Sequence, residues 1–268
     1  MREKWKYLRK MLFFPGLRRR VLGISIFFLI FAGMKKDGLL ASLLDFVFPR
    51  FCPACGARLR IDEEAVCLHC NILLPRTNHW QTPSENSMEQ LFRGRVKVEK
   101  AAAFFRYKSK TDNAGIVYDF KYHHRPQLAL KMGVMMAEEM KGHGFFDGID
   151  CIVPVPLSLK RRMKRGYNQS EMLARGAGKV TGLPVLPWVV IRKRFDGSQT
   201  HLSKWERDSN VKGVFELRDA DSIAGKHVLV VDDVITTGAT VASCAGELLR
   251  ARDCRVSVLS LGFAGKRE

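Results

Sequence analysis

The sequence feature that most constrains this chain is the stretch Val228 to Thr240, which reads Val-Leu-Val-Val-Asp-Asp-Val-Ile-Thr-Thr-Gly-Ala-Thr. Its apolar, β-branched start predicts a strand that is buried on both faces. Two adjacent carboxylates, Asp232 and Asp233, follow this strand, and a short Thr-Thr-Gly turn then opens a helix. Turn residues and a helix N-terminus present backbone N–H donors to an anion. The stretch therefore predicts a ligand site beyond the end of a buried strand.

Apolar strands alternate with helical patterns through the rest of this region. Strands are predicted at 151–155, 228–231 and 256–261, a strand or hairpin at 96–107, and helices at 126–140, 168–180 and 238–250. Fully apolar strands separated by helices predict an α/β fold with a parallel sheet covered on both faces. Ligands bind such sheets beyond the carboxyl ends of the strands. Residues 75–89 are rich in polar and turn-forming types and are predicted to be a loop.

The residues after the predicted strand divide into two chemical sets. A monophosphate site is predicted from the N–H groups, the hydroxyls and the helix dipole of Thr236, Thr237, Gly238, Ala239 and Thr240. Asp232 and Asp233 are placed to accept hydrogen bonds from ribose hydroxyls or to hold the waters of a Mg²⁺ ion. The alternative is that the two carboxylates only cap a helix and the threonines only complete its turn.

Four of the seven cysteines form two Cys-x-x-Cys pairs separated by eleven residues: Cys52 and Cys55, then Cys67 and Cys70. This spacing predicts tetrahedral coordination of Zn²⁺, and four thiolates leave no open position, so the metal is expected to be structural. Gly56 and Asn71 follow the two pairs and are residue types that readily adopt the left-handed conformation. Two disulfides, or buried thiols in a small hairpin, are the alternatives. Cys151, Cys244 and Cys254 are isolated and are expected to be core thiols.

A second candidate anion site follows the predicted strand 151–155. Residues 158–165 carry five cations and no acid. Arg161 and Arg165 are the first candidates for a phosphate contact, because a guanidinium binds phosphate bidentately. The alternatives are a solvated charged face, or a site for single-stranded nucleic acid with Tyr167 or Trp205 as a stacking platform.

The net charge of +18 suggests a polyanionic partner, and 46% apolar residues exclude a disordered chain. Residues 1–33 carry eight cations and one acid, so they contribute +7 of this charge. The apolar run 21–34 is fourteen residues long, which is short for a membrane span. A start codon placed too far upstream, a membrane-surface anchor and an export signal are the three interpretations of this segment.

Further motifs give the chain a family resemblance. These are Phe120-Lys121-Tyr122, Pro154-Val155-Pro156 and Arg165-Gly166-Tyr167-Asn168-Gln169. With the cysteine pairs and residues 228–240, which resemble the phosphoribosyl pyrophosphate motif of type I phosphoribosyltransferases, they make the chain similar to the ComF family of amidophosphoribosyltransferase-like competence proteins. The resemblance covers about residues 39–264. It implies a zinc-bearing N-terminal module, a five-stranded parallel core with a flexible hood and, in some bacteria, a part in the uptake of transforming DNA.

The resemblance also implies an activity, that of a Mg²⁺-dependent phosphoribosyltransferase. Asp232 and Asp233 would position ribose or the metal, residues 236–240 would bind the 5-phosphate of phosphoribosyl pyrophosphate, and Arg161 and Arg165 would bind its pyrophosphate. The family's hood loop corresponds to residues 192–211, with Gln199, Leu202, Arg207 and Asn210 as matching positions. The acceptor is unassigned. The alternative is a non-catalytic accessory of DNA uptake that binds single-stranded DNA or a helicase partner.

The predicted organisation has three parts. Residues 1–38 form a basic and apolar extension, residues 39–80 a zinc-knuckle module, and residues 95–268 a phosphoribosyltransferase-like domain. A cytoplasmic location is expected, because disulfides are rare there and paired cysteines more often bind metal. Contact of the extension with a membrane surface and formation of a homodimer are further expectations.

Overall fold

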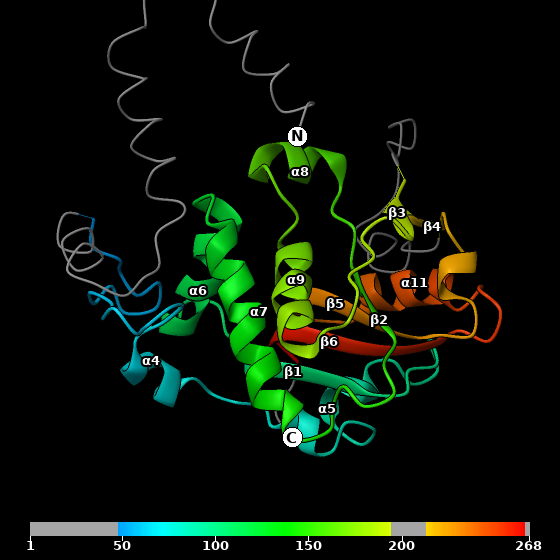
Figure 1. The fold of residues 1–268 in the computed structure, drawn as a ribbon, viewed down its shortest axis with the longest axis horizontal. Coiled ribbons are helices and arrows are strands. Elements are labelled where there is room, and N and C mark those ends of the chain that lie inside the picture. Colours follow the sequence, from blue (N-terminus) through cyan, green and yellow to red (C-terminus); the bar gives the residue numbers. More distant parts are fainter. Residues whose placement is uncertain (1–47, 194–212, 266–268) are drawn as a thin grey trace, which may run out of the picture. The chain divides into compact units, whose positions relative to one another are not determined.

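The computed structural model describes residues 48–193 and 213–265 (Figure 1). The chain divides into two compact units, Met1–Pro49 and Arg50–Glu268, and the fold below is that of the second. Within the described ranges no helix has the length and apolar character needed to cross a membrane. The N-terminal extension and the hood positions Gln199, Leu202, Arg207 and Asn210 lie outside the described residues.

The core is a parallel sheet of four strands in the order β1-β6-β5-β2. Its strands are β1 (Ala101–Arg106), β2 (Cys151–Pro154), β5 (His227–Ile235) and β6 (Arg255–Phe263). Side chains alternate between two apolar clusters, so Leu229 and Val231 face one layer and Val228 and Val230 face the other. The predicted α/β fold class, a parallel sheet with flanking helices, is confirmed.

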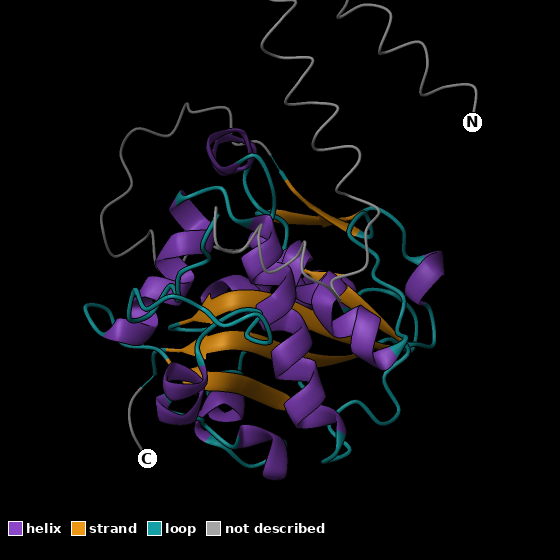
Figure 2. Ribbon diagram, turned by 60° about the vertical axis from the view of Figure 1, so that its left-hand side comes forward, coloured by secondary structure: helices purple, strands orange, loops and turns teal. Residues whose placement is uncertain are grey.

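Helices cover both faces of this sheet (Figure 2). The helices of eight or more residues are α6 (Asp112–Tyr122), α7 (Pro126–Lys141), α9 (Gln169–Thr181) and α11 (Ala239–Leu248). Helices α7 and α9 share one apolar cluster with the sheet, and α11 belongs to the other. Gly133 and Gly176 let α7 and α9 approach closely, because a Cβ there would lie 2.2 Å from the carbonyl oxygen of Leu173 and 2.1 Å from that of Leu130.

Shorter elements complete the fold. They are α4 (Leu68–Leu73), η1 (His79–Gln81), α5 (Ser87–Gln90), α8 (Leu159–Arg165), η2 (Asp221–Ile223) and the antiparallel pair β3 (Val190–Arg192) and β4 (Phe215–Leu217). Residues 75–89, predicted as a loop, contain η1 and α5 and bury Trp80 and Met88. Asn86 caps α5 by accepting the N–H groups of Met88 and Glu89, a capping signal that the polar composition hid.

The expected fifth strand is reduced to one bridge. Val185 pairs with Ile152 at the free edge of β2, and no further residue of this segment joins the sheet in the described part of the chain. Pro184 and Pro187 bracket it, and proline has no N–H to donate to a ladder. The resemblance to a five-stranded core therefore holds in position but not in strand length.

Two local predictions differ from the structure near the candidate sites. The strand predicted at 228–231 continues to Ile235, because β6 extends to Phe263 and pairs with it throughout. The acidic pair therefore lies within the last residues of β5 instead of after them. The basic stretch 158–165, for which no helix was predicted, forms α8, with Ser158 accepting the N–H of Arg161 at its start and Gly166 in the left-handed conformation at its end.

Candidate functional site

Asp233 is held by a lysine from a distant helix. The Nζ of Lys121, in the last turn of α6, donates to Oδ1 of Asp233 at 2.8 Å, and the N–H of Val234 donates to the same oxygen at 2.6 Å. Both charged side chains are largely buried, with 19% of Lys121 and 13% of Asp233 exposed. The sequence contained Lys121 within a recognised motif, but its partner was not predictable, because 112 residues separate the two.

Asp232 has a different environment. Its Oδ1 accepts the hydroxyl of Ser170 at 2.8 Å and the N–H of Asp233 at 2.9 Å. Burial, and then the neighbouring charge of Asp233, raise the pKa of Asp232 to about 7. Two carboxylates at one strand end are hard oxygen ligands of the kind that Mg²⁺ prefers, and among the described residues neither Oδ2 accepts a hydrogen bond. The acidic pair therefore fits a magnesium ion chemically.

The turn after β5 has the conformation that an anion site needs. Gly238 has φ 73° and precedes the first residue of α11, while Thr236 and Thr237 are exposed. Nη1 of Arg95 donates to the carbonyl oxygen of Thr237 at 2.7 Å, which fixes the turn from outside. Arg95 was not predicted, because nothing local to it indicates this contact. The turn thus presents hydroxyls and the N-terminus of a ten-residue helix to solvent.

The basic helix α8 supplies the second set of cations. Nη1 of Arg165 donates to Oε1 of Gln169 at 2.9 Å, and its guanidinium lies 5.5 Å from the ring centre of Tyr122. Arg161 is exposed, and its guanidinium has no partner in the described ranges. Of the two predicted phosphate ligands, Arg161 is thus free to bind an anion, whereas Arg165 is already engaged.

Two contacts attach the junction of α8 and α9 to the rest of the site. The hydroxyl of Tyr167 donates to the carbonyl oxygen of Phe120 on α6. Nδ2 of Asn168 donates to the carbonyl oxygen of Val155, just past β2, while its side-chain oxygen caps α9. The recognised motif 165–169 is therefore a structural joint, and it fixes α8 relative to the helix that carries Lys121.

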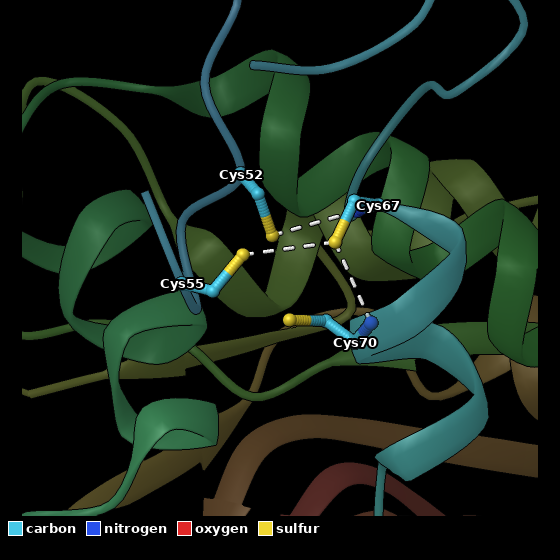
Figure 3. Close-up of side chains that lie close together, drawn as sticks. All are labelled: Cys52, Cys55, Cys67 and Cys70. Carbon is cyan, nitrogen blue, oxygen red and sulfur yellow. Dashed lines mark hydrogen bonds between the residues drawn. The ribbon is translucent and has the colours of Figure 1, made fainter. Parts of the chain in front are cut away.

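Four cysteines form a second candidate centre, in which their sulfur atoms converge (Figure 3). The Sγ atoms of Cys52, Cys55, Cys67 and Cys70 all lie within 4.8 Å of one another. Cys55 and Cys67 have their sulfurs 3.7 Å apart, close to the roughly 3.8 Å between sulfurs that a tetrahedral zinc site requires. Burial and neighbouring thiols raise the pKa of Cys70, so a cation would be needed to keep the set ionised. The cluster could hold a metal ion.

The residues that follow the two cysteine pairs behave differently. Gly56 has φ 73°, as predicted for a tight turn. The expectation for Asn71 is wrong, because Asn71 continues α4, and its side-chain oxygen accepts Nη2 of Arg76 at 2.7 Å. The second pair therefore opens a helix, with Cys67 as its cap. His69 lies on this helix and is exposed.

The cysteine centre belongs to the same compact unit as the sheet. Cys52, Leu59 and Val66 share an apolar cluster with α7 and β6. Gly115 of α6 packs against the first knuckle, where a Cβ would lie 2.2 Å from the carbonyl oxygen of Pro53. The structure thus places the four-cysteine cluster against the helix whose other end carries Lys121.

Comparison with known proteins agrees with this architecture. Residues 163–265 match the phosphoribosyl transferase domain family. The chain is 34% identical over 149 residues to DNA utilization protein YhgH of Salmonella typhi, covering 54% of this chain and 65% of that protein. It is 30% identical over 217 residues to the Escherichia coli (strain K12) protein of the same name, covering 78% and 88%. The chain belongs to the ComF family.

Other ComF-family matches are shorter. Competence protein F of Haemophilus influenzae is 37% identical over 93 residues, which cover 34% of this chain and 41% of that protein.

Among solved structures, the chain is similar to one titled as the allosteric regulatory enzyme of purine biosynthesis. The two are 22% identical, the match covers 53% of this chain and 29% of the other, and the TM-score is 0.36.

Proposed function

We propose that this protein binds phosphoribosyl pyrophosphate together with Mg²⁺ and transfers the phosphoribosyl group to an acceptor. The observation that carries the proposal is the end of β5, where Asp232 and Asp233 lie directly before the Gly238 turn and the N-terminus of α11. A carboxylate pair and a monophosphate cradle on one strand end match the two ends of a ribose 5-phosphate. The match of residues 163–265 to a phosphoribosyl transferase domain supports it.

Each residue set has one task in this proposal. Thr236, Thr237, Gly238, Ala239 and Thr240 bind the 5-phosphate. The carboxylates of Asp232 and Asp233 hold the ribose hydroxyls or the metal, and Mg²⁺ when bound would neutralise the pyrophosphate charge. Arg161 binds the leaving pyrophosphate, and Arg165 supports it. The bond from ribose C1 to pyrophosphate breaks with its electrons on the leaving group, and an acceptor lone pair forms the new bond. The rate enhancement is electrostatic and positional.

Calorimetry tests the proposal in two stages. The wild-type protein should bind phosphoribosyl pyrophosphate with Mg²⁺, and the Asp232→Asn, Asp233→Asn double variant should bind at least tenfold more weakly. Asp253→Asn is the matched control, since that carboxylate is exposed and follows the C-terminal end of α11, whereas the acidic pair precedes its N-terminal end. Pyrophosphate release is then measured over a panel of bases and amines. No binding by the wild type would reject the proposal, and binding without release would leave a non-catalytic ligand site.

A second function has its own support in the surface of α6 and α8. The rings of Tyr118 and Tyr122 are in contact, with centres 4.8 Å apart and an interplanar angle of 41°, and the two residues are 55% and 48% exposed. Beside them α8 carries five cations, one of which lies over the ring of Tyr122. Exposed aromatic rings next to cations are typical of sites for single-stranded nucleic acid. The names of the relatives, DNA utilization protein and competence protein, agree with a DNA partner.

Fluorescence anisotropy with labelled oligo-dT tests this surface. The Tyr118→Ala, Tyr122→Ala variant should lose affinity at every salt concentration with the salt slope unchanged. The Lys160→Ala, Arg161→Ala, Arg162→Ala variant should lose affinity and also show a shallower salt dependence. Lys97→Ala is a matched control on another exposed surface. Unchanged binding in both sets of variants would exclude the surface. A helicase partner, a homodimer and a cytoplasmic location stay predictions.

We also propose that the metal of the four-cysteine centre is structural Zn²⁺. All four donors are cysteine sulfurs, two from the turn before Gly56 and two from the start of α4, and four thiolates are a ligand set that zinc takes in closed structural sites.

A further inference from the structure

A cavity of about 560 Å³ lies apart from the acidic pair, where the cysteine centre meets the ends of β1 and β6. Its walls come from three segments that are distant in sequence. The cysteine centre contributes Cys55 and His69, the residues after β1 contribute Tyr107 and Lys108, and β6 contributes Phe263. The cavity opens at the carboxyl edge of the parallel sheet, where such folds bind ligands. Its volume is within the range of small-molecule sites, roughly 300–1,000 Å³.

Arg106 is the residue that gives this cavity a chemical preference. It is half-buried at the end of β1 and lines the cavity. Its backbone is fixed, because its N–H donates to Pro75 at 2.8 Å and its carbonyl oxygen accepts Nδ2 of Asn113 at 3.0 Å. Within the described residues its guanidinium makes neither a hydrogen bond nor an ion pair. A half-buried guanidinium with all five donors free favours an anionic ligand.

The remaining walls favour a flat apolar group beside that anion. Tyr107 is half-buried just after β1 and supplies an aromatic wall, whereas the ring of Phe263 is buried and packs edge-on against His79. Leu73, Leu74 and Pro75 add an aliphatic surface, and Lys108 adds a second cation near Arg106. Asp112 is the one carboxylate among the lining residues. Aromatic and aliphatic walls next to two cations suit a ring that carries a phosphate.

We propose that this cavity binds a nucleoside monophosphate, with its phosphate on Arg106 and Lys108 and its base against Tyr107 and Leu73. The site is separate from the monophosphate cradle at the end of β5, and it does not depend on the reaction proposed above. The competing explanation is structural. Four thiolates around a divalent metal carry a net charge of −2, and Arg106 and Lys108 could serve only to balance it.

Calorimetry on the zinc-loaded protein separates these explanations. AMP and CMP are titrated in the presence of excess ribose 5-phosphate, which fills the cradle at the end of β5 if that cradle binds phosphate. One site per chain should remain, and Arg106→Leu should weaken it at least tenfold, because a charged hydrogen-bonded contact is lost. Arg106→Lys should recover part of the affinity. Arg252→Leu is the control, since Arg252 is exposed and forms only a long ion pair of 3.9 Å with Asp253 among the described residues.

A second readout removes the structural explanation. Zinc content and melting temperature should be the same in the wild type and in Arg106→Leu, because this guanidinium bonds no described residue. Photo-crosslinking with 8-azido-AMP should label peptides that contain Tyr107. The proposal is overturned if neither nucleotide binds, if Arg106→Leu binds as tightly as the wild type, or if that variant loses zinc along with affinity.

Discussion

The Nζ of Lys121 lies 2.8 Å from Oδ1 of Asp233, and this ion pair joins the last turn of α6 to the end of β5. This ion pair gives the two neighbouring carboxylates different electrostatic environments. Asp233 is neutralised by a fixed cation, whereas Asp232 accepts only neutral donors and has a raised pKa. The carboxylate whose charge responds to pH and to a bound cation is therefore Asp232.

Replacing Lys121 by Met should leave Asp233 without its partner in a largely buried position. We expect a loss of about 1–3 kcal/mol in the free energy of unfolding, measured by urea denaturation. The Asp233→Asn change in the same chain should recover part of that loss, because the unpaired charge is gone. Lys97→Ala removes an exposed pair with Glu99 and should cost less than about 1 kcal/mol. Equal losses in the two lysine variants would contradict a special role for Lys121.

The raised pKa of Asp232 predicts a specific pH dependence. The folded protein keeps a proton on Asp232 up to about pH 7, while the unfolded chain loses it near pH 4. This residue therefore makes the folded state less stable as pH rises through that window. Asp232→Asn should melt a few degrees above the wild type at pH 8 and close to it at pH 4.

His227 also makes the stability of the protein depend on pH, so the wild type has to be compared with the Asp232→Asn variant. Burial, and then the charge of Arg255, lower its pKa, so His227 destabilises the folded state as pH falls below about 6.5. The two residues act in opposite directions over part of the range. The melting temperature of the wild type alone is thus uninformative, and the difference between wild type and Asp232→Asn isolates Asp232. A difference that does not grow between pH 4 and pH 8 would refute the assignment.

Two glycines, one just before α11 and one inside it, should respond to alanine in opposite ways. Gly238 has φ 73°, and a Cβ there would lie 3.3 Å from Phe92, so Gly238→Ala should cost about 1–2 kcal/mol of stability. Gly246 lies inside α11 with nothing within 4 Å of its Cβ position. Gly246→Ala should stabilise by about 0.5–1 kcal/mol. Chemical denaturation of both variants measures this, and stabilisation by Gly238→Ala would show that the turn is not constrained as described.

The four-cysteine centre should contain one metal ion per chain. Mass spectrometry under native conditions should find one Zn²⁺ in the wild type and none in Cys52→Ser, Cys55→Ser. That variant should also melt at a lower temperature, because the residues around the centre share a core with α7. Cys254→Ser, a buried cysteine outside the cluster, should keep its zinc. A wild-type protein that lacks metal but contains disulfides would reject the site.

The local sequence pattern was sufficient to predict most of the helices and strands. The helix predicted at 126–140 is α7, and the helix predicted at 168–180 is α9, capped by Asn168. Periodicity and capping act within a few residues, so one sequence contains both signals. The bounds of β5 were missed, because its length depends on how far the neighbouring strand β6 extends.

The candidate site divides in the same way: features set by local spacing were predicted, and contacts between distant segments were not. The acidic pair, the Gly238 turn and the four cysteines are each defined by spacing along the chain, and the described structure contains all of them. The roles of Lys121, Arg95 and Arg106 could not be predicted from the sequence, because each role depends on which distant segment lies beside that residue in the fold. The basic stretch was found, but its helical form and the engagement of Arg165 by Gln169 were not.

The sequence by itself determined the chemical groups that the chain carries: a buried strand ending in two acids, a turn with hydrogen-bond donors, a set of four thiols and a basic segment. Tertiary structure alone decided which of these groups are neutralised and which are free. Charge pairing, burial and cavity shape depend on contacts between segments as much as 112 residues apart. Such contacts form only when the chain folds, because the energy of a cation or carboxylate depends on its surroundings in space.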